Sequence, residues 1–279
     1  MALRRAAWLA LSLALAAAPA GAAEAEAWAA ASHPTPGAPR LIGGHGLGCI
    51  AGAVSLPPEG PGWQVVRLSR NRFWGHPSLV AYLEDLAARA RAAGLPTLWI
   101  GDLGQPRGGP LPWGHASHQI GLDADVWLDL STKPVLSSAA RERVEVASLV
   151  RPDGMTVDHR RFTPAHAALI RLAAEHPEVD RIFVNPAIKR ALCVAEPQAA
   201  WLRRVRPWRG HDSHMHVRLR CPAGQPECRD QAPVPRGNGC DASLDWWFTA
   251  EARQPPRPAA PTAPRPQMPT ACAGVLGAP

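Results

Sequence analysis

The sequence predicts an α+β fold in which a small antiparallel sheet is flanked by helices. Segments with the apolar spacing of helices alternate with short apolar runs typical of strands, and no regular β-α-β rhythm connects them. The chain has 279 residues, of which 46% are hydrophobic and 19% charged. This composition is sufficient to bury a full core and excludes a wholly disordered chain.

The N-terminus has the pattern of a secretory signal peptide. An apolar run over residues 6–18 follows Arg4 and Arg5 and leads to residues 20–22, a small-x-small cleavage sequence. Because the run is too short to span a bilayer, we expect cleavage to leave no integral membrane segment. A signal anchor that stays in the membrane is the alternative. Residues 23–41 are rich in Ala, Pro and Gly without periodicity, which predicts a linker.

The expected elements follow in order between this linker and the tail. A helix is predicted over residues 78–93, because apolar residues recur at helical spacing between Pro77 and Gly94. A second helix is predicted to begin at Thr163-Pro164 and to end before Pro177. Strands are predicted at residues 98–100, 179–184 and 214–220.

The C-terminal segment, residues 251–279, is predicted to be a proline-rich tail. Prolines recur from Pro255 onward, as in polyproline-like segments that form no core. Cys272 lies within this tail, so a disulfide there would tie it to the body. We therefore assign the folded domain to residues 42–250.

Six cysteines in an exported chain are an even set suited to three disulfides. Cys221 and Cys228 are close enough in sequence to close a short loop, and they are the pair that spacing favours. A zinc ribbon is the competing interpretation, but the sequence has no C-x2-C pair.

The formal net charge of +7 favours anionic partners. Outside the cytoplasm such partners are cell-wall or envelope components more often than nucleic acid. A GC-rich genome, which favours Arg, Ala, Pro and Gly together, would produce the same charge.

Five of the eleven histidines fall in two short windows. In the second window a strand would place His214 and His216 on one face and the apolar Met215 and Val217 on the other. One of these imidazoles could bind a metal ion while the other reaches a water on that ion. An H-x-H pair alone is a weak signal, and His45, among others, shows no pattern at all.

The first window strengthens the metal hypothesis. His118 and Asp125 are seven residues apart with Gly121 between them, which suits a turn that leads into a strand. Asp123 has the same strand parity as Asp125, so either carboxylate could be the ligand. Two histidines and one carboxylate are typical of catalytic zinc. A hydrogen-bonded His118–Asp125 pair that caps the turn is the alternative, and His115 fits a surface position as well as a functional one.

Residues 49 to about 248 resemble the penicillin-insensitive murein endopeptidases, which belong to a wider group of zinc peptidases with D-alanyl-D-alanine dipeptidases and the N-terminal domain of hedgehog proteins. The resemblance is carried by the motifs at residues 72–77, 101–104, 114–125, 181–189, 205–208 and 214–222.

The resemblance implies a hedgehog/DD-peptidase-like fold, with His118, Asp125 and His216 as zinc ligands. It also implies that His214 is the catalytic base and that His211 is a further active-site histidine. His115 corresponds to a residue that holds a second metal in some relatives, together with an aspartate and a histidine further on. Asp153 fits the aspartate, but Thr156 stands where the histidine is expected. The implied disulfides are Cys49–Cys272, Cys193–Cys240 and Cys221–Cys228.

The activity implied by the resemblance is hydrolysis of D-alanyl-meso-diaminopimelyl cross-links in periplasmic peptidoglycan. The sequence after residue 22 has no S-x-x-K motif, so no serine nucleophile of that type is expected for penicillin to trap. The alternatives are a zinc D,D-carboxypeptidase or dipeptidase of the same fold, and a non-catalytic wall-binding protein.

Overall fold

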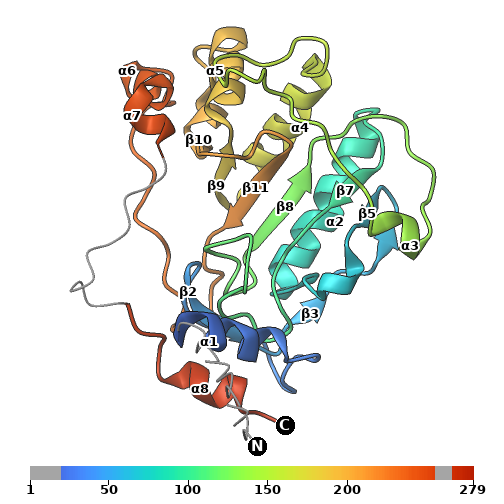
Figure 1. The fold of residues 1–279 in the computed structure, drawn as a ribbon, viewed down its shortest axis with the longest axis vertical. Coiled ribbons are helices and arrows are strands. Elements are labelled where there is room, and N and C mark those ends of the chain that lie inside the picture. The colour runs from blue at the N-terminus through green and yellow to red at the C-terminus, as the bar shows by residue number, and fades with distance from the viewer. Residues whose placement is uncertain (1–19, 255–265) are drawn as a thin grey trace, which may run out of the picture.

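The computed structural model describes residues 20–254 and 266–279, and its main element is a mixed sheet (Figure 1). The strands of this sheet are β4 (Glu59–Gly60), β5 (Trp63–Val65), β7 (Leu98–Ile100), β8 (Asp123–Trp127), β9 (Val179–Val184), β10 (Val205–Pro207) and β11 (His214–Leu219). Their order is β10-β9-β11-β8-β7-β5-β4. β10 pairs with β9 and β5 with β7 in parallel, whereas the other neighbours are antiparallel.

The α+β class is confirmed, but the sheet is larger than the sequence predicts and is not wholly antiparallel. The additional strands β4, β5 and β10 have only two or three residues each. Such short strands show no alternating pattern, because a period of two needs four or more residues to be recognised. The three strands expected at β7, β9 and β11 are present.

Three of the four helices with ten or more described residues begin at a proline that follows a capping residue. They are α2 (Pro77–Ala92), α4 (Pro164–Glu175) and α5 (Pro186–Ala195), capped by His76, Thr163 and Asn185. The first two confirm the sequence prediction, whereas α5 was not expected. Shorter helical segments are η1 (Leu68–Arg70), α3 (Ser138–Arg141), η2 (Ala200–Arg204), α6 (Ala242–Asp245), η3 (Trp246–Phe248) and α7 (Ala250–Arg253).

The main core lies between the sheet and these helices. Met215, Val217 and Leu219 on β11 are fully buried in one cluster with leucines of α2 and α4, such as Leu83 and Leu169. Since side chains alternate along a strand, His214, His216 and Arg218 lie on the opposite face of β11. The packing of the core thereby turns the polar residues of this strand away from the helices.

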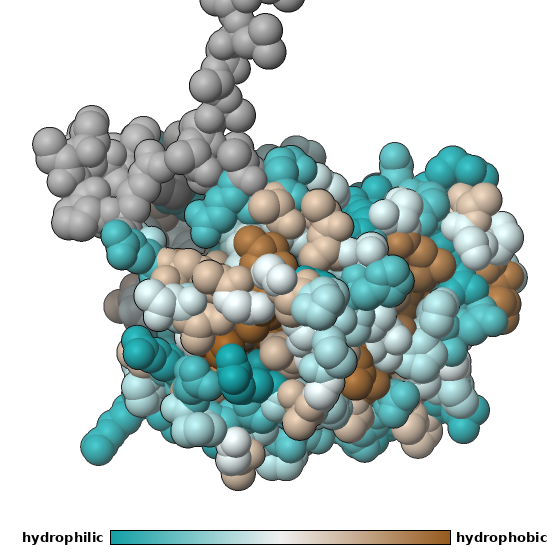
Figure 2. All heavy atoms as spheres, turned by 90° about the horizontal axis from the view of Figure 1, so that it is seen from below, coloured by the Kyte–Doolittle hydropathy of each residue, from teal (hydrophilic) through white to brown (hydrophobic). Residues whose placement is uncertain are grey.

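Both ends of the described chain pack together. α1 (Ala20–Ala29) and α8 (Ala271–Leu276) lie side by side at one end of the molecule (Figure 1), where Trp28 is buried beside Cys49 and Cys272. The structure thus places a helix in the segment where the sequence predicts a linker, because Trp28 buries its ring there. Figure 2 views the molecule from this end and shows apolar residues in small groups between polar ones.

The remaining strands form two small sheets. β1 (Arg40–Gly44) pairs with β2 (Leu47–Ala51), and β3 (Val54–Ser55) pairs with β6 (Trp74–Gly75). The three disulfides implied by the resemblance are all present. Residues 1–19 of the signal peptide expected over residues 1–22, and residues 255–265 of the proline-rich tail, lie outside the described residues. Within the part that the structure describes, no helix has the length and apolar character needed to cross a membrane.

Candidate metal centre

The two histidine windows meet on neighbouring strands. β8 and β11 pair antiparallel, and in this register His216 lies opposite Asp125 and Arg218 lies opposite Asp123. All four side chains are buried. The pairing brings residues that are about 90 positions apart in sequence to one face of the sheet, opposite the helices.

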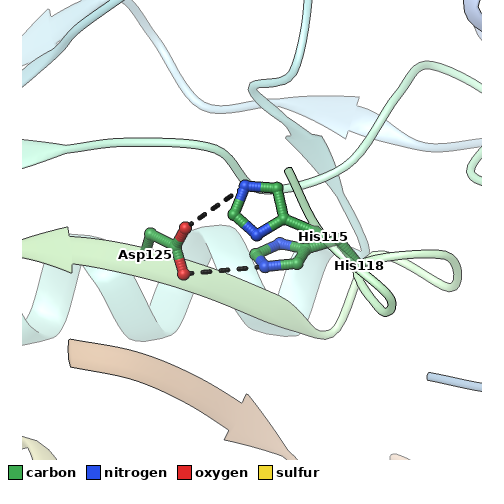
Figure 3. Close-up of side chains that lie close together, drawn as sticks. All are labelled: His115, His118 and Asp125. Carbon is green, nitrogen blue, oxygen red and sulfur yellow. Dashed lines mark ion pairs between the residues drawn. The ribbon is translucent and has the colours of Figure 1, made fainter. Parts of the chain in front are cut away.

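The loop before β8 adds two further histidines. His118 has a left-handed backbone, with φ of 67°, and Gly121 has φ of 68°. This sharp turn directs His115 and His118 toward Asp125 (Figure 3). His118 Nε2 lies 3.6 Å from Asp125 Oδ1, and His115 Nε2 lies 3.6 Å from Asp125 Oδ2. Ligand atoms of His115, His118 and Asp125 lie within 4.8 Å of one another, so this group can hold a metal ion.

Two buried acceptor atoms at this centre have no hydrogen-bond partner. His118 Nδ1 donates to the carbonyl of Leu103, so the neutral ring has its lone pair on Nε2. This Nε2 atom and the facing Asp125 Oδ1 are both buried and unpartnered. Two unpaired acceptors in a buried site are unfavourable to each other, and a cation between them would satisfy both. The residues present therefore fit a metal ion.

The pKa values at this pair agree with that fit. Burial lowers the pKa of His118 to about 3, and the charge of Asp125 only partly offsets this effect. Burial acts to raise the pKa of Asp125, but His214 and His118 outweigh it and hold the pKa well below its usual range. His118 is therefore neutral and Asp125 ionised at neutral pH, which are the forms that bind metals.

His216 lies between two carboxylates. Its Nε2 is 3.1 Å from Asp123 Oδ1, and its Nδ1 is 3.4 Å from Asp125 Oδ1. Burial lowers the pKa of His216, but the two carboxylates outweigh burial and raise it to about 9. Positive charge is thus favoured beside Asp125. If Nε2–H donates to Asp123, the neutral ring carries its lone pair on Nδ1, the atom that faces Asp125 Oδ1. The group whose ligand atoms lie within 4.8 Å of one another contains His115 and does not contain His216.

Asp123, which the residue pattern left open as a ligand, is fully occupied by donors. It accepts from the backbone N–H of His118 at 3.0 Å and from Arg218 Nε at 2.7 Å, in addition to His216. His45 Nδ1 lies 3.3 Å away. Asp123 therefore orients His216 and the loop of His118. The sequence analysis missed His45, for which no sequence signal exists.

Asp102 is a second carboxylate whose role the sequence analysis missed. It follows β7 directly and lies near His115 Nε2 at 3.1 Å, Arg70 Nη1 at 3.0 Å and Arg72 Nη1 at 3.0 Å. Burial raises its pKa, but the hydrogen bond from His115 and the charge of Arg70 lower it further than burial raises it. His115 is thus shared between Asp102 and Asp125. Asp102 could have been singled out from its place in the motif at residues 101–104, which carries part of the family resemblance.

His214 and His211 lie beside the centre. His214 Nε2 is 3.8 Å from Asp125 Oδ2, and the rings of His214 and His211 are 4.9 Å apart. His211 has φ of 51° and donates from Nδ1 to the carbonyl of Arg209. Burial, followed by the charges of His214 and His216, lowers the pKa of His211 to about 4. Neutral His211 therefore presents Nε2 as a hydrogen-bond acceptor.

Two open cavities with different linings adjoin the centre. The larger, of about 910 Å³, is lined by His211 and His216 together with Trp208 and Arg209. The smaller, of about 390 Å³, is lined by His214 and Asp125 together with Arg67 and Glu145. His115 lines both cavities. A chain that passes over the centre could therefore occupy both.

Residues 41–277 match the family model described as penicillin-insensitive murein endopeptidase. The chain belongs to this family. The matched range contains every residue of the centre described above. Among similar curated proteins, the penicillin-insensitive murein endopeptidase of Haemophilus influenzae is 50% identical over 221 residues, covering 78% of this chain and 74% of that protein. Those of Klebsiella pneumoniae and Salmonella typhi are each 46% identical over 250 residues, covering 88% of this chain and 89% of each relative.

Proposed function

We propose that this chain is a periplasmic zinc endopeptidase that hydrolyses D-alanyl-meso-diaminopimelyl cross-links in peptidoglycan and is insensitive to penicillin. The observation that carries the metal part of the proposal is the unpartnered pair of buried acceptors, His118 Nε2 and Asp125 Oδ1. Membership in the murein endopeptidase family supports the substrate.

The proposed zinc ligands are His118 Nε2, Asp125 Oδ1 and His216 Nδ1. Two imidazoles and one carboxylate suit zinc better than calcium or magnesium, and three protein ligands are typical of catalytic sites. His115 is the less suitable third ligand, because its Nε2 is shared with Asp102. Bound zinc supplies Lewis-acid polarisation of the scissile carbonyl and lowers the pKa of water toward about 7.

His214 is the proposed general base. It is partly exposed and lies beside Asp125 in the smaller cavity, so a water at the centre and a substrate can both reach it. In this role the imidazole takes a proton from the attacking water and returns it to the leaving nitrogen. His211 presents an acceptor at Nε2, which suits a hydrogen bond from a substrate N–H or a water and does not suit an oxyanion. Its proposed role is to orient the substrate or the water.

The two cavities favour an endopeptidase over a carboxypeptidase or dipeptidase. A cross-link continues as a peptide on both sides of the scissile bond, and two separately lined cavities adjoin the centre. A carboxypeptidase needs extended space on only one side. Hydrolysis by activated water needs no acyl-enzyme, which is the basis of the expected penicillin insensitivity.

The proposed periplasmic location rests on the signal-like N-terminus and on three disulfides. The disulfides join Cys49 to Cys272, Cys193 to Cys240 and Cys221 to Cys228. Such bonds persist in oxidising compartments and are rare in the bacterial cytosol.

The test is cleavage of purified cross-linked muropeptide dimers by residues 23–279, followed by mass spectrometry. We expect conversion of dimers to monomers, loss of conversion with a chelator, recovery on addition of zinc, and no effect of penicillin. Release of free D-alanine from monomers without dimer cleavage would instead identify a carboxypeptidase. Cleavage that persists without bound metal would contradict the zinc proposal.

A further inference from the structure

We propose that Arg67 binds the free carboxylate that lies next to the leaving nitrogen of the cross-link, and that it thereby selects substrates with an unmodified diaminopimelate at that position. The proposal rests on the proposed function. It assigns a chemical specificity to the smaller cavity.

The position of His214 determines which half of the substrate enters this cavity. The group that returns a proton to the leaving nitrogen must lie beside that nitrogen. His214 lines the smaller cavity, whereas His211 lines the larger one. The amine half of the cross-link therefore lies in the smaller cavity, and the acyl half lies in the larger.

The amine half brings a negative charge with it. In the proposed substrate, the leaving nitrogen and a free carboxylate are attached to the same carbon of meso-diaminopimelate. This carboxylate enters the cavity within a few ångströms of the reacting bond. Because desolvation of a carboxylate is costly unless it is paired, the cavity must provide a cation.

Among the residues that line this cavity, the two arginines differ in their partners. Arg70 Nη1 lies 3.2 Å and 3.0 Å from the two carboxylate oxygens of Asp102 and is therefore already paired. For Arg67, by contrast, no carboxylate lies within ion-pairing distance in the described part of the chain. Its Nη2 donates to the carbonyl of Val144 at 2.9 Å, and its Nε is buried without a partner. Arg67 therefore forms no ion pair with any described residue, although carboxylates such as that of Glu145 line the same cavity.

Arg67 is also held in place. Its guanidinium lies over the ring of Trp127, with Cζ 5.4 Å from the ring centroid, and Trp127 lines the same cavity. This stacking and the bond to Val144 restrict the side chain before substrate arrives. A pre-positioned guanidinium loses less conformational entropy when it binds a carboxylate.

The backbone at Arg67 supports a functional role. In the described residues, four non-glycine residues have a positive φ, namely Arg67, Asn71, His118 and His211. His118 and His211 belong to the centre. Arg67, the N-cap residue of η1, has φ of 57° and ψ of 47°, a conformation that costs energy for an arginine; such residues persist where the surrounding structure fixes them, and they cluster at functional sites.

The experiment compares two synthetic cross-linked peptides that differ only in this group, one with the free carboxylate and one with a carboxamide. We expect the wild-type protein to cleave the free acid roughly 10- to 100-fold more efficiently, as is typical for loss of one charge-assisted hydrogen-bonded pair. In Arg67→Ala, kcat/KM for the free acid should fall by a similar factor, mainly through KM. Cleavage of the carboxamide should change little.

Two further variants separate binding from folding. Arg67→Gly accepts the left-handed backbone without strain, and we expect it to lose the preference as Arg67→Ala does. Arg67→Lys keeps the charge and should recover part of the preference. Arg91→Ala removes an exposed arginine of α2 and serves as the matched control, with unchanged rates on both peptides.

The outcomes are distinct. Equal cleavage of the two peptides by the wild-type protein, or an equal loss on both peptides in Arg67→Ala and Arg67→Gly, overturns the role of Arg67 and leaves the proposed function intact. If the wild-type protein with zinc cleaves neither peptide and no muropeptide dimer, the proposed function fails, and the role of Arg67 fails with it.

Discussion

The metal centre and the surroundings of Lys189 are both buried and polar, but they differ in how their hydrogen bonds are satisfied. Lys189 lies on α5 and is fully buried, and its Nζ donates to the carbonyls of Leu202 at 2.8 Å and Asn238 at 2.7 Å. Burial, with the charge of Arg206, lowers the pKa of Lys189 to about 7. A neutral amine has two N–H groups, and each has one acceptor here.

At the metal centre, by contrast, two buried hydrogen-bond acceptors have no hydrogen-bond partner. His118 Nε2 and Asp125 Oδ1 are acceptors that face each other at 3.6 Å and make no hydrogen bond, and His216 Nδ1 comes no closer to Oδ1 than 3.4 Å. Buried polar groups in native proteins are nearly always paired, so a satisfied cluster indicates a structural role and an unsatisfied one indicates a missing ligand. The comparison predicts that substitutions at the metal centre reduce activity, whereas substitutions at Lys189 reduce stability.

The largest expected effect is that of His214→Ala. Loss of a general base typically costs about 10²- to 10⁴-fold in kcat. Because the side chain of His214 is one-quarter exposed and Asp125 keeps its other neighbours, we expect stability to change by less than about 0.5 kcal/mol and zinc to remain bound. Turnover of muropeptide dimers, metal content and urea unfolding provide the three readouts.

The matched control for this variant is His159→Ala, at an exposed histidine away from the centre. It should keep full activity. Near-normal turnover in His214→Ala would exclude this residue as the base.

A smaller effect is expected for Asp123→Asn. This change leaves the proposed ligands in place but removes the charge that His216 Nε2 and Arg218 contact. Loss of a carboxylate that orients a metal-binding histidine typically weakens metal affinity by about 10- to 100-fold. Competition for zinc against a chromogenic chelator measures this change.

Asp241→Asn provides the comparison for that measurement, because Asp241 is exposed and caps its own helix at Ser243. Its zinc affinity should equal that of the wild-type protein. If Asp123→Asn also bound zinc with unchanged affinity, Asp123 would have no part in orienting His216.

Local patterns in the sequence predict much of the fold. Pro77 and Pro164 follow capping residues and mark the starts of α2 and α4. The alternation in β11 correctly places Met215 and Val217 in the core. These predictions succeed because caps, prolines and strand alternation act within a few residues of the chain.

Features that depend on contacts between residues far apart in the sequence could not be predicted from local patterns. The register that sets His216 opposite Asp125 joins strands about 90 residues apart, and no local pattern specifies it. The positions of Asp102 and His45 beside the histidines also depend on this assembly. Spacing favoured the disulfide Cys221–Cys228, whereas the resemblance supplied the other two pairs and the preference for Asp125 over Asp123. The roles of the site residues stay predictions.

The last prediction concerns the stability of the protein at Lys189 as a function of pH, and its size per pH unit is modest. Between about pH 7 and pH 10.5, the unfolded chain holds a proton on this lysine that the folded chain has released. Raising the pH through this range therefore favours the folded state, by at most about 1.4 kcal/mol per pH unit. Below pH 7 both states are protonated, and folding must bury the charge.

In Lys189→Met, two carbonyls lose their donor, so stability should be lower overall, and this pH-dependent gain should disappear. Urea unfolding of both proteins from pH 6 to pH 10 tests the difference, and equal slopes in the two proteins would show that Lys189 stays charged when buried.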